Sequence, residues 1–187
     1  MPTWMVVEDE PDIYDVLLAM FDLWGIEGVA FVDGAEAIAW IELVDQGRVH
    51  GDLPVLAIID IRLPEVSGPE VAARLRRSPV LGHIAIVLIT AYHMSPEEEK
   101  EAIDLAQADL LMYKPLPAMA ELRAQMDQVI AKRPKPATVG ARAAAPELAP
   151  PVTATVVTAK SDQPRLSDSG KPGTTPPGLP DQKPVQG

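Results

Sequence analysis

The sequence contains no cysteine and only three histidines. The missing cysteines exclude a disulfide framework, a cysteine nucleophile and a thiolate metal site. The histidines, His50, His83 and His93, are scattered and include no close pair of the metal-ligand type. No apolar run approaches the ~20 residues that a membrane span needs, and residues 1–4 lack the basic region and apolar stretch of a secretory signal. We therefore expect a soluble, cytoplasmic protein that does not associate with membranes.

Positive charge is also scarce, with 16 lysines and arginines against 27 acidic residues and a net charge of −11. The balance is uneven, because residues 1–132 have a net charge of −14 and residues 133–187 a net charge of +3. Nonspecific nucleic-acid binding depends on Lys and Arg contacts with phosphates, so the acidic part argues against a direct nucleic-acid partner. The acidic charge is compatible with a cation site or a basic partner, and equally with acidic groups that only maintain solubility.

Aromatic residues make up only 4% of the chain, and all eight of them precede residue 133. The 55 residues that follow hold 11 of the 20 prolines and are rich in Ala, Thr, Gly and Ser, without helical or strand periodicity. Such a composition cannot bury enough apolar surface to offset chain entropy, which predicts a disordered tail over 133–187. Within this tail only 152–157 resembles a strand, and it is either a docking motif or part of a solvated segment.

Residues 1–132 alternate short apolar runs with amphipathic stretches of helical period. The expected strands cover 4–7, 29–32, 55–60, 84–90 and 110–113, and the expected helices cover 12–24, 35–44, 67–76, a stretch beginning at 95, and 119–130. Three helix starts carry the spacing of a capping box, at Asp33 and Glu36, Ser67 and Glu70, and Ser95 and Glu98. The alternation predicts one domain over 1–132, an α/β fold with a parallel sheet covered by helices on both faces.

Polar residues follow the apolar runs at the points where four of the expected strands end. They are Glu8, Asp9 and Glu10 after the first strand, Asp60 after the third, Thr90 after the fourth, and Lys114 followed by Pro115 after the fifth. Because ligands of open α/β sheets bind outside the carboxyl ends of the strands, we expect these side chains to meet at one edge.

The chemistry of this set indicates a phosphoryl-acceptor site. Neighbouring carboxylates repel unless a cation lies between them, and Mg²⁺ prefers a few oxygen ligands together with water. Asp60 can then attack phosphorus as a nucleophile, while Thr90 and Lys114 donate to the phosphoryl oxygens. Each residue alone has a structural explanation, such as a helix cap, a strand end or a solvated lysine. Their joint occurrence at the ends of different strands favours the functional interpretation.

The sequence resembles the receiver domain of two-component response regulators over residues 3–131. The matching stretches are Val6-Val7-Glu8-Asp9-Glu10-Pro11, Ile59-Asp60-Ile61-Arg62-Leu63-Pro64-Glu65-Val66-Ser67-Gly68, Ile89-Thr90-Ala91 and Lys114-Pro115. The resemblance implies a flavodoxin-like (βα)5 three-layer sandwich with strand order 2-1-3-4-5. It also implies that Asp60 takes a phosphoryl group from a histidine kinase or phosphotransfer protein.

The same resemblance implies the roles of the other site residues. Asp9 and Asp60 would bind Mg²⁺ directly, Glu8 would assist through water, and the backbone carbonyl of Arg62 would supply a further ligand. Thr90 and Lys114 would hold the phosphoryl oxygens. A cis peptide bond between Lys114 and Pro115 is expected as well.

Two features depart from the family pattern or vary within it. The aromatic switch residue of the fifth strand is replaced by Leu111, while the aromatic Tyr113 stands directly before Lys114 and on the same strand face as Leu111. The coupling between threonine and aromatic is therefore expected to be altered or missing. Arg62 and Tyr92, each two residues beyond a site residue, would overhang the acceptor and slow hydrolysis of its phosphoryl group. The alternative is that Arg62 pairs with a surface acid such as Glu65.

The most consistent interpretation is a receiver without an attached output domain, which signals through contact with a downstream protein and is not an enzyme in its own right. The resemblance places that contact on the face of the fourth helix, fifth strand and fifth helix, and it allows weak pairing of two copies there. One alternative is a non-phosphorylated pseudo-receiver that serves as a scaffold. Another is a hydrolase of the haloacid dehalogenase type, which Arg62 disfavours because that family needs an Asp at this position for proton transfer.

Overall fold

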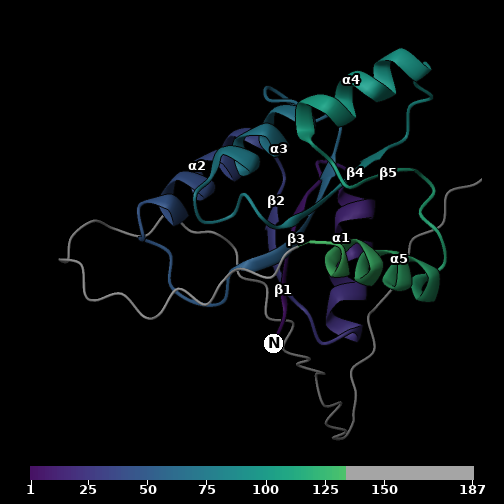
Figure 1. Cartoon of the computed structure of the whole chain (residues 1–187). Coiled ribbons are helices and arrows are strands. Elements are labelled where there is room, and N and C mark those ends of the chain that lie inside the picture. The colour runs from purple at the N-terminus through teal and green to yellow at the C-terminus, as the bar shows by residue number, and fades with distance from the viewer. Residues whose placement is uncertain (134–187) are drawn as a thin grey trace, which may run out of the picture.

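Five strands and five helices alternate along the chain in a computed structural model that describes residues 1–133 (Figure 1). The elements are β1 (Thr3–Val7), α1 (Pro11–Leu23), β2 (Glu27–Phe31), α2 (Gly34–Asp45), β3 (Pro54–Asp60), α3 (Gly68–Arg77), β4 (Ala85–Thr90), α4 (Pro96–Ala106), β5 (Leu110–Tyr113) and α5 (Met119–Ala131). Apart from Arg133, the predicted tail and its strand-like stretch 152–157 lie outside the described residues.

The strands form one parallel sheet in the order β2-β1-β3-β4-β5, which confirms the predicted topology. The helices α1 and α5 cover one face, and α2, α3 and α4 cover the other (Figure 1). Every parallel connection therefore passes over one of the two faces, as an α/β sandwich requires. Among residues 1–133, no helix has both the length and the hydropathy to cross a bilayer.

The strands are apolar throughout because both faces of the sheet are covered. Met5 and Val7 of β1 pack into the core beneath α2, α3 and α4, whereas the alternate residues Trp4 and Val6 pack into the core beneath α1 and α5. All four of these side chains are almost completely buried. Burial of a large apolar side chain contributes roughly 1.5–3 kcal/mol to the free energy of unfolding, so the interior strand β1 is a main source of stability.

Side chains at the expected positions cap three of the helices. Ser95 accepts from the Glu98 backbone N–H at 3.2 Å, and the Glu98 carboxylate accepts from the Ser95 N–H at 2.7 Å, which completes the predicted capping box. At the start of α3 the Glu70 carboxylate accepts from the Ser67 N–H at 3.0 Å. At the start of α2 the Asp33 carboxylate accepts from the Glu36 N–H at 2.8 Å. These local bonds explain why the helices begin within a residue of the predicted positions.

The second strand begins two residues earlier than its apolar run predicts. Gly28 interrupts the apolar pattern of β2, and α1 packs directly over it. A Cβ at this position would lie only 2.9 Å from Cδ2 of Leu18. The missing side chain allows the close helix–strand contact, and it also removes the sequence signal of a strand.

A buried arginine ties together the amino ends of β4 and β5. Arg76 of α3 donates to the Ile84 carbonyl at 2.6 Å and to the Asp109 carboxylate at 3.0 Å, and its side chain is only 6% exposed. Arg133 lies 2.6 Å from the other oxygen of Asp109. The end of α5 is thus fixed at the edge of the sheet that carries the amino ends of the strands.

The loop between β3 and α3 folds back over the carboxyl end of β3. Glu65 adopts a left-handed backbone conformation with a φ of 61°, and the Gly68 N–H donates to the Ile61 carbonyl at 3.0 Å. This return brings Gly68 against the backbone of Asp60, where a Cβ would lie 1.9 Å from the carbonyl oxygen. The position therefore needs glycine, and the contact fixes the end of β3.

We expect Gly68→Ala to lower the free energy of unfolding by about 1–3 kcal/mol, the usual cost of overpacking, because the Asp60 carbonyl cannot move without shifting β3. Urea denaturation measures this loss. In the control variant Gly28→Ala the added Cβ meets side chains and not backbone, the flexible end of Leu18 at 2.9 Å and the Phe21 ring at 3.4 Å, so the loss should be smaller. Equal losses in the two variants would contradict the argument.

Candidate active site

The structure brings three of the predicted site residues into direct contact at the carboxyl edge of the sheet. The Lys114 Nζ lies 2.9 Å from Glu8 Oε2 and 2.9 Å from Asp60 Oδ1. Thr90 is completely buried at the end of β4, and its carbonyl accepts from the Lys114 N–H at 2.7 Å. Asp9 is exposed and makes no hydrogen bond or ion pair within residues 1–133. The peptide bond between Lys114 and Pro115 is cis, as the resemblance implied.

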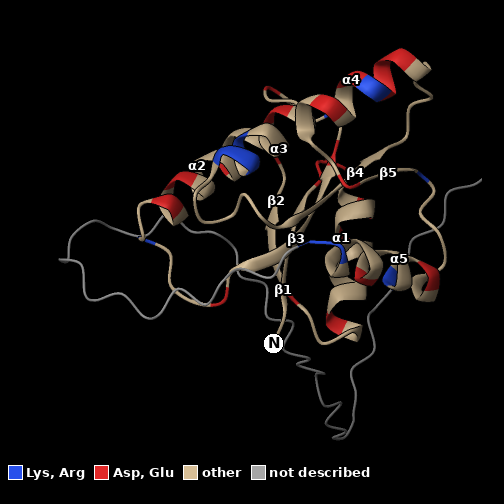
Figure 2. Cartoon of the chain, in the orientation of Figure 1, with Lys and Arg blue, Asp and Glu red and all other residues tan. Residues whose placement is uncertain are grey.

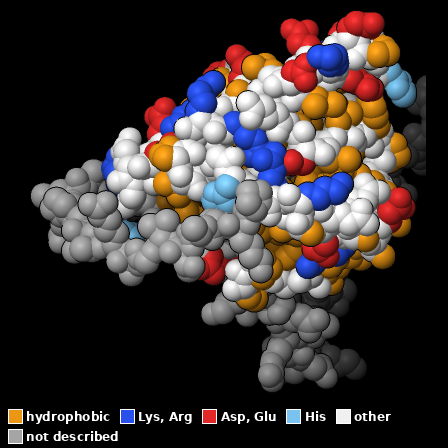
Figure 3. Space-filling model, in the orientation of Figure 1, with side chains coloured by type: hydrophobic (Ala, Val, Ile, Leu, Met, Phe, Trp, Pro, Cys, Tyr) orange, Lys and Arg blue, Asp and Glu red, His pale blue; other side chains and the backbone are white. Residues whose placement is uncertain are grey.

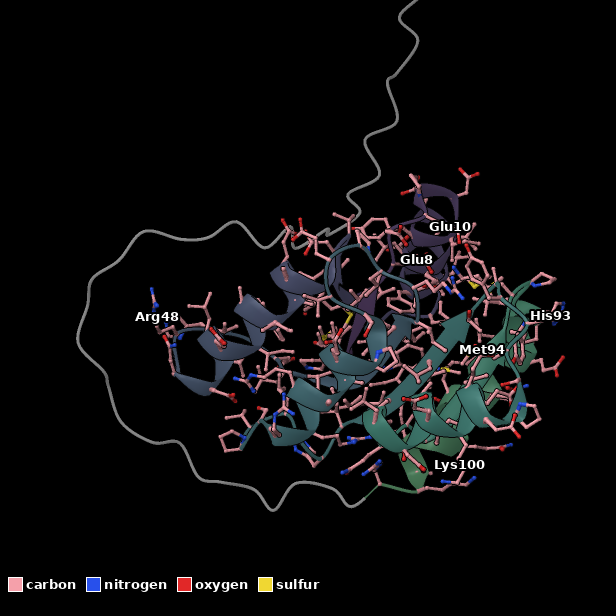
Figure 4. All side chains as sticks on the ribbon, turned by 90° about the horizontal axis from the view of Figure 1, so that it is seen from above. Glu8, Glu10, Arg48, His93, Met94 and Lys100 are labelled. Carbon is pink, nitrogen blue, oxygen red and sulfur yellow. The ribbon has the colours of Figure 1, made fainter. Side chains whose placement is uncertain are left out.

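A third carboxylate shares the lysine. Glu10 Oε1 lies 2.9 Å from Lys114 Nζ, and Figure 4 shows Glu10 close to Glu8 where β1 ends. The ammonium group has three hydrogens, so Glu8, Glu10 and Asp60 each have one donor. The sequence placed Glu10 in the acidic run but gave it no role. The exposures differ strongly: 0% for the Glu8 side chain, 6% for Asp60 and Lys114, and 57% for Glu10.

This geometry shifts two pKa values in the same direction. Burial by itself lowers the pKa of Lys114, but its hydrogen bonds to Glu10, Glu8 and Asp60 together outweigh burial and raise the pKa above the ordinary lysine value. Burial raises the pKa of Glu8 above the ordinary 4.5, the Lys114 hydrogen bond opposes the rise, and the Asp60 charge adds to it. Lys114 therefore remains protonated, whereas ionisation of Glu8 lowers the stability of the folded state.

Backbone N–H groups orient the two remaining polar side chains. Asp60 Oδ2 accepts from the Arg62 N–H at 2.6 Å, so both oxygens of this carboxylate have a donor. Thr90 Oγ1 accepts from the Tyr92 N–H at 3.2 Å, which leaves the hydroxyl hydrogen free to donate. The site thus combines a fixed, buried carboxylate with an ammonium and a hydroxyl as donors.

The side chains of Arg62 and Tyr92 pair above this edge. The Arg62 Cζ lies 3.8 Å from the centroid of the Tyr92 ring, within the range of a cation–π interaction. Tyr92 remains 52% exposed, so the pair is at the rim and not in the core. Arg62 forms no ion pair with Glu65 in the part of the chain that the structure describes. The Arg62 charge acts instead on another surface acid, Glu98: hydrogen bonds from Ser95 lower the pKa of that carboxyl most, and Arg62 lowers it further.

The side chains at this edge can bind a hard cation. Within residues 1–133, no three acidic or histidine side chains are close enough to form a metal site by themselves. A site completed by a backbone carbonyl and water needs fewer side chains. Glu8 Oε2 is buried without a well-directed hydrogen bond, even though Lys114 is near. An all-oxygen set in which one carboxylate oxygen is unsatisfied fits Mg²⁺ better than a softer metal.

Leu111 and Tyr113 share a face of β5, as the alternation predicted. Leu111 packs against the core beneath α3 and α4. The Tyr113 hydroxyl donates to the Glu99 carboxylate of α4, and its ring stacks on His93 with centroids 5.9 Å apart and an interplanar angle of 26°. The sequence gave no sign of either contact, because nothing distinguishes Glu99 from the acids beside it.

Comparison with protein families matches residues 4–127 to the response regulator receiver domain. The chain belongs to this family. Receiver domains are the phosphoryl-accepting modules of two-component signalling, so the predicted family and fold are confirmed.

Curated relatives agree with this assignment. The chain is 34% identical over 96 residues to the polar-differentiation response regulator DivK of Brucella anthropi, an alignment that covers 51% of this chain and 72% of the relative. The DivK proteins of Brucella ovis and Brucella suis match with the same identity and coverage.

Solved structures show the same fold. A CheY-like receiver domain from Methanospirillum hungatei is 21% identical with a TM-score of 0.59, covering 70% of this chain and 94% of that one. The receiver domain of the sensor histidine kinase PA1611 from Pseudomonas aeruginosa is 22% identical with a TM-score of 0.58, covering 70% and 98%. That structure has a magnesium ion coordinated in its active-site cleft.

We expect Glu8→Gln to raise the free energy of unfolding at neutral pH. A carboxyl whose pKa is raised on folding destabilises the folded state above the ordinary 4.5, and this cost vanishes at lower pH, where both states are protonated. The gain should therefore shrink as the pH falls from neutral towards 4.5 and below, which urea denaturation across that range measures.

Glu10→Gln is the matched control, because it removes a carboxylate from the same lysine at an exposed position. It should change stability little and with little dependence on pH. A Glu8→Gln variant that is less stable than the wild type at neutral pH would contradict the prediction.

Proposed function

We propose that Asp60 accepts a phosphoryl group from a phosphohistidine of a histidine kinase or phosphotransfer protein. The observation that carries this proposal is the buried Asp60 carboxylate, held by Lys114 on one oxygen and by the Arg62 N–H on the other at the carboxyl edge of a receiver fold. A carboxylate fixed in this way is presented to a donor without the entropic cost of orienting it.

In the transfer, an Asp60 oxygen forms a bond to phosphorus while the bond from phosphorus to the donor nitrogen breaks. The donor imidazole keeps the electron pair of that bond, and the product is an acyl phosphate on Asp60. The Lys114 ammonium and the free hydrogen of the Thr90 hydroxyl donate to the phosphoryl oxygens as their charge shifts. On transfer, Lys114 gives up some of its contacts with the surrounding carboxylates. The negatively charged phosphoryl oxygens take the place of those contacts.

A Mg²⁺ ion completes the proposed site. Asp9 and Asp60 would hold the ion directly, Glu8 through water, and the Arg62 carbonyl would add a backbone ligand. When bound, the ion neutralises the charge of the phosphoryl oxygens. The all-oxygen donor set and the unsatisfied Glu8 Oε2 support this proposal, as does the magnesium in the related PA1611 receiver.

We propose that the chain acts as an acceptor and not as a turnover enzyme, since the covalent product stays on Asp60 until water removes it. Arg62 supports this view, because a guanidinium at this position cannot perform the proton transfer that a hydrolase needs. Since donor and acceptor must meet where ATP-dependent histidine phosphorylation takes place, we propose that the exchange occurs in the cytoplasm.

The output passes to a downstream protein through the face of α4, β5 and α5. Figure 2 shows that acidic residues dominate α4, which disfavours nucleic acid as the direct partner. In Figure 3 hydrophobic side chains gather below α4, and Leu105 and Met119 are 50% and 39% exposed. An apolar patch beside acidic charge suits a protein partner, and it suits weak pairing of two copies of this chain.

Incubation with acetyl phosphate and Mg²⁺ should add one phosphoryl group to the chain, as intact-mass spectrometry detects. Asp60→Asn should abolish the addition, because the amide is a poor nucleophile that leaves the geometry of the site largely intact. An equal mass increase in this variant, or none in the wild type, would refute the proposal.

We expect Arg62→Ala to speed the loss of the phosphoryl group several-fold, because the Arg62–Tyr92 pair limits the access of water to Asp60. Tyr92→Ala should have a similar effect, since it removes the other half of the same pair. Glu65→Ala is the control from the same loop and should leave the rate unchanged. The decay of phosphorylated protein after removal of the donor measures all three rates, and a wild-type rate in both pair variants would rule out the shielding role.

A further inference from the structure

A groove lies where the carboxyl end of α1 meets the amino end of β2, and we name it the α1–β2 groove. It has a volume of about 750 Å³, and most of its lining is apolar, with Leu18, Phe21 and Ile26 among the residues that form it. Within residues 1–133, the two most exposed large hydrophobic side chains both line this groove, Met1 at 82% and Leu23 at 70%. Apolar side chains that gather in one exposed hollow mark a binding surface.

The charged side chains of the α1–β2 groove are all acidic. Asp22 comes from the last turn of α1 and Glu27 from the first position of β2. Within the described part of the chain, no lysine or arginine lines the groove, and the ammonium of Met1 lies 3.6 Å from Asp52, which is not a lining residue. The groove therefore suits an apolar segment that contains no acid and has a basic residue beside it.

One stretch of the chain outside the described residues has this composition. The chain continues for 54 residues beyond Arg133, and residues 152–157 contain three valines. No other six-residue stretch of 134–187 contains three large apolar residues. Lys160 follows closely, and no acidic residue lies between Glu147 and Asp162. The segment thus complements the groove in both apolar character and charge.

The tail starts at the same end and on the same side of the molecule as the groove. Arg133 follows α5 and pairs with Asp109 at the amino end of β5, and α1 and α5 cover the same face of the sheet (Figure 1). β2 and β5 are separated by four strand spacings, a span of roughly 20 Å.

The length of the intervening chain matches this span. Eighteen residues lie between Arg133 and Val152. The end-to-end distance of a flexible chain of that length is roughly 20–25 Å, and its full extension is roughly 60 Å. Residues 152–157 can therefore reach the α1–β2 groove without strain in the connection.

We propose that residues 152–157 dock in the α1–β2 groove of the same chain. The valines cover the exposed side chains of Met1 and Leu23, while Lys160 faces Asp22 and Glu27. A connection of matching length gives the segment an effective concentration of millimolar order. A segment whose Kd for the groove is about 1 mM would then occupy it about half of the time. This docking does not depend on phosphoryl transfer to Asp60.

A spin label in the tail tests the proposal in the full-length chain, because the sequence has no cysteine and a single introduced cysteine is labelled uniquely. A nitroxide attached in Thr158→Cys stands directly beside the docking segment. In ¹⁵N-labelled protein the amide signals of Leu23 and Gly28 should lose most of their intensity relative to the same sample with the nitroxide reduced. The amides of Asp60 and Thr90, at the opposite end of the strands, should keep theirs.

Variants of the tail show whether residues 152–157 are responsible. A nitroxide in Thr175→Cys is the control for a label elsewhere in the tail, and it should broaden the groove amides much less. Val156→Asp, combined with the label in Thr158→Cys, should restore the groove signals because a carboxylate is unfavourable in an apolar groove with acidic residues. Val185→Asp adds the same charge outside the segment and should restore nothing.

A matched pair of variants tests the groove itself. Leu23→Lys replaces a side chain that is already 70% exposed, so the fold should be retained while the valines lose their contact. The groove signals should recover in this variant. Leu105→Lys makes the same change at an exposed leucine of α4, on the other face of the sheet, and should leave the broadening as in the wild type.

A mixed sample identifies the source of the docked segment. It combines ¹⁵N-labelled chain without a nitroxide and unlabelled chain that carries the nitroxide in Thr158→Cys. The groove signals should stay sharp in this mixture. Broadening equal to that within one chain would assign the groove to the tail of a second copy and overturn the proposal. Sharp groove signals in the labelled chain itself, or equal broadening over the whole domain, would also overturn it, and neither result would affect phosphoryl acceptance.

Discussion

The buried ammonium of Lys114 is the group on which the rest of the site depends. Two of its three carboxylate partners, Glu8 and Asp60, are nearly inaccessible to water, so removal of the lysine would leave like charges facing each other in a poorly solvated place. The lysine and its partners come from the ends of three different strands, β1, β3 and β5. Only a strand order in which β1 and β3 lie at the centre of the sheet and β5 lies nearby brings all of these side chains together. The charge balance of the site and the strand order therefore support each other.

This arrangement also explains why the carboxyl edge combines rigid and yielding parts. Asp60 is fixed by a backbone N–H, by the lysine and by the close approach of Gly68, which leaves it little freedom. Glu10 and the Arg62–Tyr92 pair, by contrast, are largely exposed and can move without disturbing the core. The Asp60 carboxylate is thus held in one orientation. The exposed side chains around it, which control the access of a donor or of water, can rotate.

Much of this could be predicted from the sequence, because the strands are fully apolar and their ends are marked by polar residues. The convergence of Glu8, Asp60 and Lys114 follows from parallel strands alone, and the resemblance supplied their roles and the cis bond before Pro115. Asp9 lies at the predicted edge, but its side chain makes no hydrogen bond or ion pair there among residues 1–133.

Contacts set by side-chain direction over long sequence distances could not be predicted. Glu10 was one acid in a run of three, and Glu99 was one of four in the first turns of α4. Only the fold shows which of them meets a partner. Arg62 had two plausible neighbours, and stacking on Tyr92 prevailed over the nearby carboxylate because the ring lies directly above the same edge. The early start of β2 was hidden by a glycine that serves helix packing.

The Arg76–Asp109–Arg133 cluster has a practical consequence. It clamps the end of α5 at the pole of the molecule farthest from Asp60 along the strand direction. A fluorophore, an affinity handle or a solid support joined beyond Arg133 would therefore leave the reactive pole facing outward. The domain could be tethered to a sensor chip in a uniform orientation, with its phosphoryl-accepting end free to meet molecules in the flowing solution.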